Sequence, residues 1–143
     1  MVKKPEISIV MNCHNGERFL EEAINSVLNQ TYKKWELIFW NNSSKDNSEK
    51  IFKSFKDKRL RYFYTPKKVS LYISRNAAVN KARGKFIAFL DVDDIWFPNK
   101  LKLQLKKFED TKVGLVYGKF IKYNKNSPFR KKQFITKKDL PEG

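Results

Sequence analysis

The chain has 143 residues, and its 31 Lys and Arg against 15 Asp and Glu give a formal net charge of +16. This length allows one domain rather than two. Apolar residues make up 41% of the chain and aromatic residues 15%, which excludes a disordered basic tail because so much apolar surface predicts a packed core.

The sequence also limits the compartment and the kind of metal site. No apolar run approaches the roughly 18 residues that a membrane-spanning helix needs, and the first residues lack the apolar stretch of a secretory signal. We therefore expect a cytoplasmic protein. The single cysteine, Cys13, forms no internal disulfide, and the single histidine, His14, cannot build a histidine-rich metal site. Any metal is expected to have oxygen ligands.

The positive charge favours an anionic partner, and nucleic acid, acidic lipid headgroups and phosphorylated small molecules all fit it. Lysine pairs occur along the whole chain, at 3–4, 33–34, 67–68, 106–107, 131–132 and 137–138. This distribution indicates a solvated basic surface rather than one binding stripe. The aromatic residues fall in predicted strands and helices instead of on a stacking platform, so we expect no nucleic-acid partner.

The first half of the chain alternates apolar runs with polar loops. Residues 7–11 form an apolar run rich in β-branched side chains and predict a buried strand. An apolar stripe over residues 17–30 predicts a helix, and residues 35–40 predict a second strand. The loop that follows consists almost wholly of turn and capping residues, and a second helix is expected from residue 48 to about residue 56.

The second half continues this alternation. Residues 60–64 predict a third strand, and residues 70–82 predict a third helix that Gly84 closes as a left-handed cap. Residues 86–90 predict a fourth strand. Pro98 is expected to open a helix, with Leu101, Leu105 and Phe108 on its inner face, and a fifth strand is predicted at residues 113–117.

This order of elements predicts an α/β fold with a mainly parallel sheet, covered by helices on both faces and binding its ligands at the carboxyl ends of the strands. From about residue 125 the pattern ends, and we expect a basic tail or linker. The chain has only 5 Gly, and none follows the spacing of dinucleotide-binding or nucleoside-triphosphatase loops, which excludes those two classes.

Three carboxylates follow the fourth predicted strand at once. Asp91, Asp93 and Asp94 would repel one another unless a positive group were bound nearby. Mg²⁺ or Mn²⁺ takes oxygen ligands, commonly one or two carboxylates with water and substrate phosphates, and an Asp-x-Asp segment at a strand end fits that task. The alternative is structural, with Asp93 or Asp94 capping a turn before Pro98.

Other polar side chains are expected at the same edge of the sheet. They follow the first strand, follow the second strand or lie early in the third helix, and they comprise Asn12, His14, Asn15, Asn41, Asn42, Asp46, Arg75 and Asn76. The Asn amides suit the edge of a base, Arg75 suits a diphosphate, and a metal on the aspartates would bridge that diphosphate. Singly, each Asn is also a typical turn residue, His14 a partly buried hydrogen-bonding residue and Arg75 a helix-surface residue.

Taken together, these residues resemble glycosyltransferase family 2, which has the GT-A fold. The resemblance runs from about residue 7 to residue 123 and rests on four motifs in order: ISIVMNCHN, SVLNQTYKKWELIFWNNSSKDNS, SRNAAVNKARGKFIAFLDVDD and IWFPNKLKLQ. It implies a Rossmann-like, three-layer α/β/α domain over residues 1–124. It also implies a nucleoside-diphosphate sugar donor, usually a UDP-sugar, and a role in cell-surface polysaccharide biosynthesis.

The resemblance assigns roles to positions in this sequence. The residues implied to bind the nucleotide sugar are Asn12, His14, Asn15, Asn42, Asp46, Arg75, Asp91 and Asp93. The residues implied to hold Mn²⁺ or Mg²⁺ are Asp91, Asp93 and Asp94. The reaction is expected to be an inverting transfer to a saccharide or a lipid-linked acceptor, with contact to an anionic membrane surface at the inner face.

Two features depart from the family pattern. Asn41 and Asn42 stand where the family usually has two aspartates, which relaxes or alters the expected base preference because an amide both donates and accepts. The chain also ends where the acceptor-binding half would start, so residues 125–143 form a tail or the beginning of that half. No catalytic base is evident, and we expect donor binding with weak or no transfer; a silent nucleotide-binding fragment is the alternative.

Overall fold

The computed structural model describes residues 4–122 and 133–134, in two compact units, 1–103 and 104–143. The first unit contains the following elements in chain order: β1 (Ile7–Cys13), α1 (Glu17–Leu28), β2 (Trp35–Asn42), α2 (Ser48–Ser54), β3 (Leu60–Thr65), α3 (Leu71–Val79) and β4 (Phe86–Phe89). Helix α4 (Lys100–Lys107) begins in this unit. No helix among the described residues is long and apolar enough to cross a membrane.

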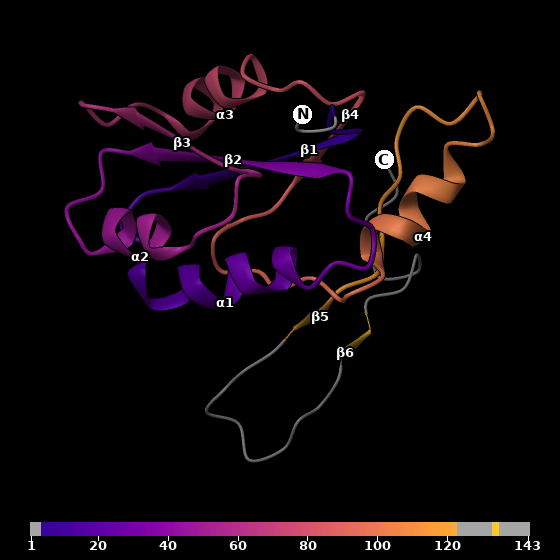
Figure 1. Cartoon of the computed structure of the whole chain (residues 1–143), viewed down its shortest axis with the longest axis horizontal. Coiled ribbons are helices and arrows are strands. Elements are labelled where there is room, and N and C mark those ends of the chain that lie inside the picture. Colours follow the sequence, from indigo (N-terminus) through magenta and orange to yellow (C-terminus); the bar gives the residue numbers. More distant parts are fainter. Residues whose placement is uncertain (1–3, 123–132, 135–143) are drawn as a thin grey trace. The chain divides into compact units, whose positions relative to one another are not determined.

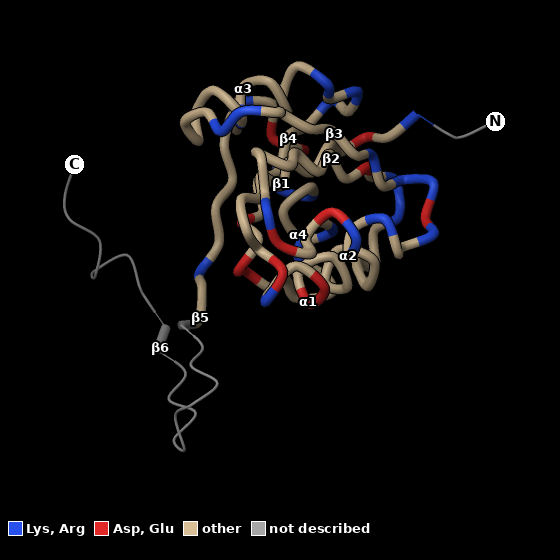
Figure 2. Tube along the Cα trace, turned by 90° about the vertical axis from the view of Figure 1, so that its left-hand side faces the viewer, with Lys and Arg blue, Asp and Glu red and all other residues tan. Residues whose placement is uncertain are grey.

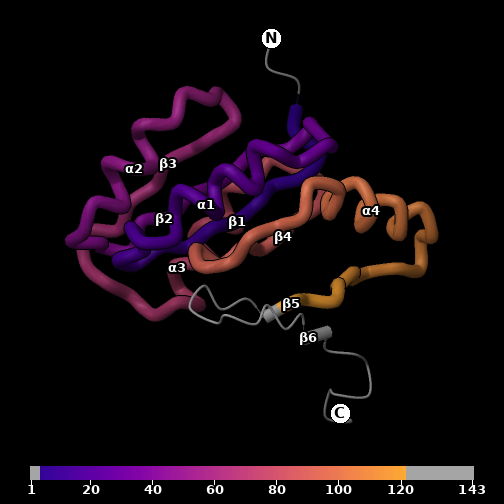
Figure 3. Tube along the Cα trace, turned by 90° about the horizontal axis from the view of Figure 1, so that it is seen from below, coloured from indigo at the N-terminus to yellow at the C-terminus, as the bar shows by residue number. Residues whose placement is uncertain are grey.

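The sheet of the first unit is parallel, as predicted. Its four strands lie in the order β3-β2-β1-β4, and all three neighbouring pairs are parallel. Helices α1 and α2 cover one face and α3 covers the other (Figure 1). Seen from the α1 side, α1 lies along the strands (Figure 3). The predicted three-layer α/β/α arrangement is therefore confirmed, and the carboxyl ends of β1, β2 and β3 lie at one edge.

Both faces of the central strands are buried because side chains alternate along each strand. Ile9 and Met11 of β1 belong to the larger core, which α1 completes with Leu20 and Ile24. Val10, between them, points to the other face, where it packs with Ile38 of β2 and Ala78 of α3. Each fully buried aliphatic side chain stabilises the fold by about 1.5–3 kcal/mol relative to an exposed one. Strand β1 lies between β2 and β4 and contributes such side chains to both faces of the sheet.

The fifth strand predicted at residues 113–117 is not formed. Residues 113–120 have no regular secondary structure, and the side chains of Leu115 and Tyr117 are 80% and 75% exposed. A strand needs a neighbouring strand for its N–H and C=O groups, and the described residues provide none for this segment. The second unit instead pairs β5 (Ile121–Lys122) with β6 (Gln133–Phe134), antiparallel and two residues each.

The remaining predicted boundaries differ in smaller ways. Helix α4 begins at Lys100 rather than at Pro98: the N–H of Lys100 closes a turn onto the C=O of Phe97 at 3.0 Å, and the N–H of Leu103 donates to the C=O of Asn99 at 3.0 Å. The predicted tail at residues 125–143 lies outside the described residues except for β6. The domain boundary after residue 124 stays a prediction.

Gly84 is not the left-handed cap that the sequence suggested. No glycine among the described residues has a positive φ. A Cβ at Gly84 would lie 2.7 Å from the backbone N of Ser8 and 2.8 Å from the carbonyl carbon of Ile7. Glycine is needed here because the chain entering β4 lies directly against the backbone of β1, and the N–H of Gly84 donates to Ser8 Oγ at 2.9 Å.

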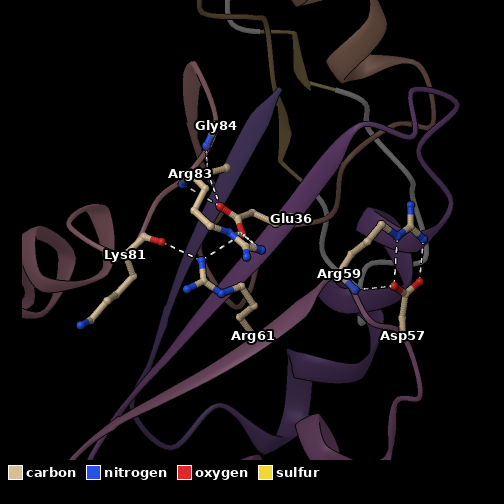
Figure 4. Close-up of polar contacts among 8 residues, drawn as sticks. Glu36, Asp57, Arg59, Arg61, Lys81, Arg83 and Gly84 are labelled. Atoms are coloured by element: carbon tan, nitrogen blue, oxygen red, sulfur yellow. Dashed lines mark hydrogen bonds and ion pairs between the residues drawn. The ribbon is translucent and has the colours of Figure 1, made fainter. Parts of the chain in front are cut away.

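The buried carboxylate of Glu36 connects three strands to the loop before β4 (Figure 4). Its Oε1 accepts hydrogen bonds from Ser8 Oγ at 2.7 Å and from the N–H of Arg83 at 2.8 Å. Its Oε2 accepts from Arg83 Nε at 2.8 Å and from Arg61 Nη1 at 2.9 Å. The Glu36 side chain is only 2% exposed, whereas that of Arg83 is 52% exposed.

This network fixes the ionisation of Glu36. Burial raises the pKa of Glu36, but the hydrogen bonds from Arg83, Ser8 and Arg61 lower it by more, so the net pKa lies below its ordinary value. A carboxyl whose folded pKa is depressed stabilises the fold fully above its unfolded pKa. That stabilisation is lost as the pH falls through the folded pKa.

We expect Glu36→Gln to lower the free energy of unfolding by about 2 kcal/mol at pH 7. Breaking a fully buried ion pair typically costs about 3–5 kcal/mol of stability. The loss expected here is smaller because Arg83 is half exposed and stays hydrated. The deficit should begin to shrink once the pH falls below about 4.3, the ordinary Glu pKa that Glu36 has in the unfolded chain, and it should vanish as the pH passes the lower pKa that Glu36 has in the folded protein. Urea unfolding at pH 7 and at several pH values down to 3 measures both effects.

Glu21→Gln is the matched control, because Glu21 is exposed on α1 and the substitution changes the charge equally. The control should shift the unfolding midpoint little at any pH. A Glu36→Gln deficit that stays constant from pH 7 to pH 3 would contradict the role of the ionised carboxylate.

Candidate functional site

The polar loops predicted to converge do meet at the carboxyl edge of the sheet. β1 and β2 pair along their whole length up to Cys13 and Asn41, so the loops that follow them begin side by side. A Cβ at Gly16 would lie 2.7 Å from Val92 Cγ2 and 2.8 Å from Cys13 Sγ. The absence of a side chain at Gly16 therefore lets the aspartate segment after β4 pack against the loop after β1.

The loop after β1 is held by the loop after β2. Asn15 has a left-handed φ of 57°, its Oδ1 accepts from the N–H of Lys45 at 2.8 Å, and its own N–H donates to Ser44 Oγ at 3.0 Å. His14 Nδ1 donates to the C=O of Asn42 at 2.9 Å, which leaves Nε2 as an acceptor in the neutral ring. An open cavity of about 430 Å³ lies beside these loops, lined by Asn15, Glu17, Arg18, Lys45 and Asp46.

Asp46 braces the amino-terminal ends of two helices. Its Oδ2 accepts from the N–H of Glu17 in α1 at 2.9 Å. Its Oδ1 accepts from both the N–H and the hydroxyl of Ser48 in α2, at 3.0 Å and 2.6 Å. Burial raises the pKa of Asp46, but these hydrogen bonds lower it by more, so the carboxyl stays ionised well into the acid range. Both oxygens are thus engaged within the protein.

The two asparagines that end β2 are also engaged. Asn41 Oδ1 accepts from the N–H of Ser44 at 2.9 Å, and its Nδ2 donates to the Tyr62 hydroxyl at 3.0 Å. Asn42 Oδ1 accepts from the N–H of Val69 at 3.0 Å, and its Nδ2 donates to the C=O of the same residue at 2.8 Å. These amides connect β2 to its own turn, to β3 and to the segment before α3.

Arg75 and Asp91 form an ion pair at the same edge. Arg75 Nη2 lies 2.7 Å from Asp91 Oδ1, and the guanidinium carbon lies 5.2 Å from the ring centroid of Phe89. The side chain of Asp91 is 60% exposed, so the pair is open to solvent and to ligands. The structure therefore brings two predicted phosphate-site residues together, one from α3 and one from the loop after β4.

The aspartate segment has chemistry that suits a cation. Burial raises the pKa of Asp94, and the charges of Asp93 and Asp91 raise it further, so the three carboxylates repel one another. In the described part of the chain, no backbone N–H donates to the side chain of Asp93 or Asp94, so the capping alternative is not observed. No three His, Cys, Asp or Glu residues among those described lie close enough together to hold a metal by themselves. A cation bound here needs further ligands.

Two side chains at this edge have buried polar atoms with no hydrogen-bond partner among the described residues. These atoms are the Oδ1 and Nδ2 of Asn12 and the Nε of Arg75. An unsatisfied buried donor or acceptor costs about 1–3 kcal/mol, so such groups indicate a place where a ligand supplies the missing partner.

Gln30 is a positioning residue that no charge or turn pattern indicated. Its side chain is fully buried. The Nε2 of Gln30 donates to the C=O of Phe97 at 2.8 Å, and its Oε1 accepts from the N–H of Leu101 at 3.1 Å. It thus ties the chain beyond the aspartates, including the first turn of α4, to the end of α1. In the sequence Gln30 stands between two other polar residues, Asn29 and Thr31, so nothing there distinguished it from an ordinary helix end.

Comparison with known proteins places the chain in a family. The profile described as "Glycosyl transferase family 2" matches residues 8–141. This chain belongs to glycosyl transferase family 2. The match extends beyond residue 123, where the resemblance of the motifs ended. It includes the edge that carries Asn12, Arg75 and Asp91.

Named relatives support this membership. The chain is 37% identical over 121 residues to "UDP-Glc:alpha-D-GlcNAc-diphosphoundecaprenol beta-1,3-glucosyltransferase WfgD" of Escherichia coli, an alignment that covers 85% of this chain and 48% of the relative. It is 32% identical over 105 residues to "Putative teichuronic acid biosynthesis glycosyltransferase TuaG" of Bacillus subtilis, covering 72% and 42%. The chain spans about half the length of the curated relatives it matches.

Solved structures share the GT-A fold. S. aureus TarS 1-349 in complex with UDP-GlcNAc superimposes with a TM-score of 0.68 at 22% identity, over 73% of this chain and 31% of that chain. The mannosyltransferase PcManGT from Pyrobaculum calidifontis, in complex with GDP-Man and Mn²⁺, has a TM-score of 0.71 at 20% identity, over 78% and 34%. The predicted GT-A fold is therefore confirmed for this chain.

We expect Asp46→Ala to lower the free energy of unfolding by about 2 kcal/mol, because the first turns of both α1 and α2 lose their side-chain acceptor. Asp46→Asn is the matched variant: one amide oxygen replaces part of the cap, so about half of the loss should be recovered. Urea unfolding without any nucleotide measures the effect. An unchanged midpoint for Asp46→Ala would show that Asp46 has no bracing role.

Proposed function

We propose that this chain binds a nucleoside-diphosphate sugar, with a UDP-sugar as the donor, for transfer of the sugar to an acceptor hydroxyl. The observation that carries the proposal is the meeting of Asn12, Arg75 and Asp91 at the carboxyl edge of a parallel sheet in a family 2 chain. Ligands of open α/β sheets bind at that edge.

The roles of the site residues follow from their chemistry. Asn12, His14 and Asn42 border the space for the base, where His14 Nε2 and the Asn12 amide are the available polar groups. Asn15 and Asp46 hold the two loops that form this border. Arg75, with Asp91 and Asp93, faces the diphosphate, since a guanidinium is suited to bidentate contact with phosphate oxygens.

The donor set fits a divalent cation of the Mg²⁺ or Mn²⁺ type. Asp91, Asp93 and Asp94 offer only oxygen atoms, and the mutual repulsion that raises the pKa of Asp94 would be relieved by a cation. Two of these carboxylates would hold the cation, with water and diphosphate oxygens as its further ligands. When bound, the cation supplies Lewis-acid stabilisation of the departing diphosphate.

A bound metal is supported by comparison as well. PcManGT, which has the same fold, was solved with GDP-Man and Mn²⁺. Arg75 is the residue of this chain that would change partner on loading, because Asp91 Oδ1 is occupied by its guanidinium at 2.7 Å. Released from Asp91, the guanidinium is free to contact a phosphate.

The acceptor in this proposal is a saccharide or a lipid-linked saccharide. The sugar is transferred to it with inversion at the anomeric carbon. WfgD, whose printed name specifies a diphosphoundecaprenol acceptor, and TuaG, named for teichuronic acid biosynthesis, support a role in making cell-surface polysaccharides. The proposed location is cytoplasmic, with contact at the inner membrane face, and the net charge of +16 supports it because it favours anionic surfaces. Over the described residues, Lys and Arg are spread around the molecule (Figure 2). We do not assign a catalytic base, and the carboxylates of Glu109 and Asp110, in the second unit, are not part of the proposed site.

The proposal predicts metal-dependent nucleotide binding. Calorimetric titration of UDP into the folded chain should show binding with Mn²⁺ and none with EDTA. Asp93→Ala should weaken UDP binding in Mn²⁺ at least about tenfold, or about 1.4 kcal/mol, because a carboxylate ligand of the cation is removed.

Glu21→Ala serves as the control, because it removes an exposed carboxylate from α1. It should leave the affinity for UDP unchanged. If the folded chain binds UDP neither with Mn²⁺ nor with EDTA, the alternative of a silent fragment is supported. Equal affinity of Asp93→Ala and wild type would remove Asp93 from the metal site.

A further inference from the structure

We propose that Asn12 is the residue that hydrogen-bonds the edge of the donor base, and that Asn42 is a positioning residue that holds α3 in place. This inference rests on the proposed function, because it divides the work within the same nucleotide site. It departs from the resemblance to the family, which implies that Asn42 contacts the base.

The amide of Asn42 is already used by the protein. Both of its polar atoms pair with the backbone of Val69, at 3.0 Å and 2.8 Å, in the manner of a neighbouring strand. The residue is 5% exposed. An aspartate at this position would accept from the Val69 N–H, but it could not donate to the Val69 C=O and would place a charge against that oxygen. In this chain an amide makes both hydrogen bonds to Val69, whereas a carboxylate could make only the one from the Val69 N–H.

The pairing with Val69 controls the start of α3. Ser70 follows Val69 directly and is the N-cap residue of α3. One turn into that helix lies Arg75, whose guanidinium binds Asp91. Asn42 therefore determines where Arg75 is presented, although its own side chain makes no contact with the Arg75–Asp91 pair among the hydrogen bonds described.

Asn12 has the opposite environment. Its Oδ1 and Nδ2 are both buried and both lack a partner in the described structure. Two residues earlier on β1, Val10 packs against Ala78 of α3, so Asn12 points to the same face of the sheet. Arg75 lies one turn before Ala78, and its Nε is likewise buried and unpartnered.

The loop with Asp91 reaches this same place. The register pairs Val10 with Phe89, and the N–H of Leu90 still donates to the C=O of Val10 at 3.1 Å, so the chain runs alongside β1 up to the residue before Asp91. Arg75 stacks over Phe89 and binds Asp91. Asn12 therefore lies on the same face and at the same end of the sheet as the Arg75–Asp91 pair, which is where the proposed function places the nucleotide.

The chemistry of an amide selects the edge that it can bind. Oδ1 accepts a hydrogen bond from a ring N–H and Nδ2 donates one to the adjacent C=O, which is the pattern of uracil and guanine. Turned over, the same amide serves cytosine, whose ring nitrogen accepts and whose amino group donates. Asn12 therefore tolerates both pyrimidines, whereas a carboxylate in its place could only accept and would disfavour the cytosine ring nitrogen.

The test is titration of UDP, CDP and inorganic pyrophosphate, each with Mn²⁺, into the wild-type chain and three variants. Asn12→Leu has a similar shape without polar atoms, and it should weaken UDP and CDP binding about tenfold while leaving pyrophosphate unchanged. Asn12→Asp should raise the ratio of UDP affinity to CDP affinity about tenfold. Asn42→Asp should weaken all three ligands by the same factor and lower the thermal midpoint, with the UDP-to-CDP ratio unchanged.

Thermal unfolding without nucleotide separates binding from structure. Asn12→Leu should unfold at or above the wild-type temperature, because it removes buried atoms that have no partner in the free protein. An unchanged ratio in Asn12→Asp, a changed ratio in Asn42→Asp, or equal losses for UDP and pyrophosphate in Asn12→Leu would each overturn the inference. A folded wild-type chain that binds pyrophosphate but no nucleotide, or nothing at all, would instead contradict the proposed function.

Discussion

The buried carboxylate of Glu36 is the interaction on which the arrangement of the sheet depends. It accepts hydrogen bonds from Ser8 on β1, from Arg61 on β3 and from Arg83 in the loop before β4, while itself standing on β2. A charge in the core is tolerated only when its hydrogen bonds are complete. The four strands are therefore held in one register at their amino ends, and the carboxyl ends meet at one level as a consequence.

The carboxyl edge is organised in two layers of hydrogen bonding. Asn15, Asp46 and Asn42 use their side chains to hold loops and helix ends against one another. Inside this frame, the amide atoms of Asn12 and the Nε of Arg75 have no hydrogen-bond partner among the described residues. A rigid frame around unsatisfied groups is the arrangement expected of a preformed ligand site, since the cost of holding those groups is met by the surrounding structure.

Much of the fold could be predicted because its causes are local. Periodicity located the strands and helices of the first unit, and the parallel sheet followed from their alternation. The strand predicted at residues 113–117 failed because an apolar run forms a strand only where a neighbour accepts its hydrogen bonds. Gly84 was recognised as necessary for the wrong reason, because close approach to Ser8 is a contact between segments far apart in the sequence.

The sequence by itself determined the family, the strand and helix order of the first unit, and the set of polar residues at the edge of the sheet, because periodicity, turn chemistry and motif spacing are local properties. Only the tertiary structure decided what each polar residue does. Asn12 and Asn42 are the same residue type after similar apolar runs, yet Asn42 is paired with Val69, whereas Asn12 has no hydrogen-bond partner in the part of the chain that the structure describes. Hydrogen-bond partners distant along the chain are set by packing, and no local pattern encodes them.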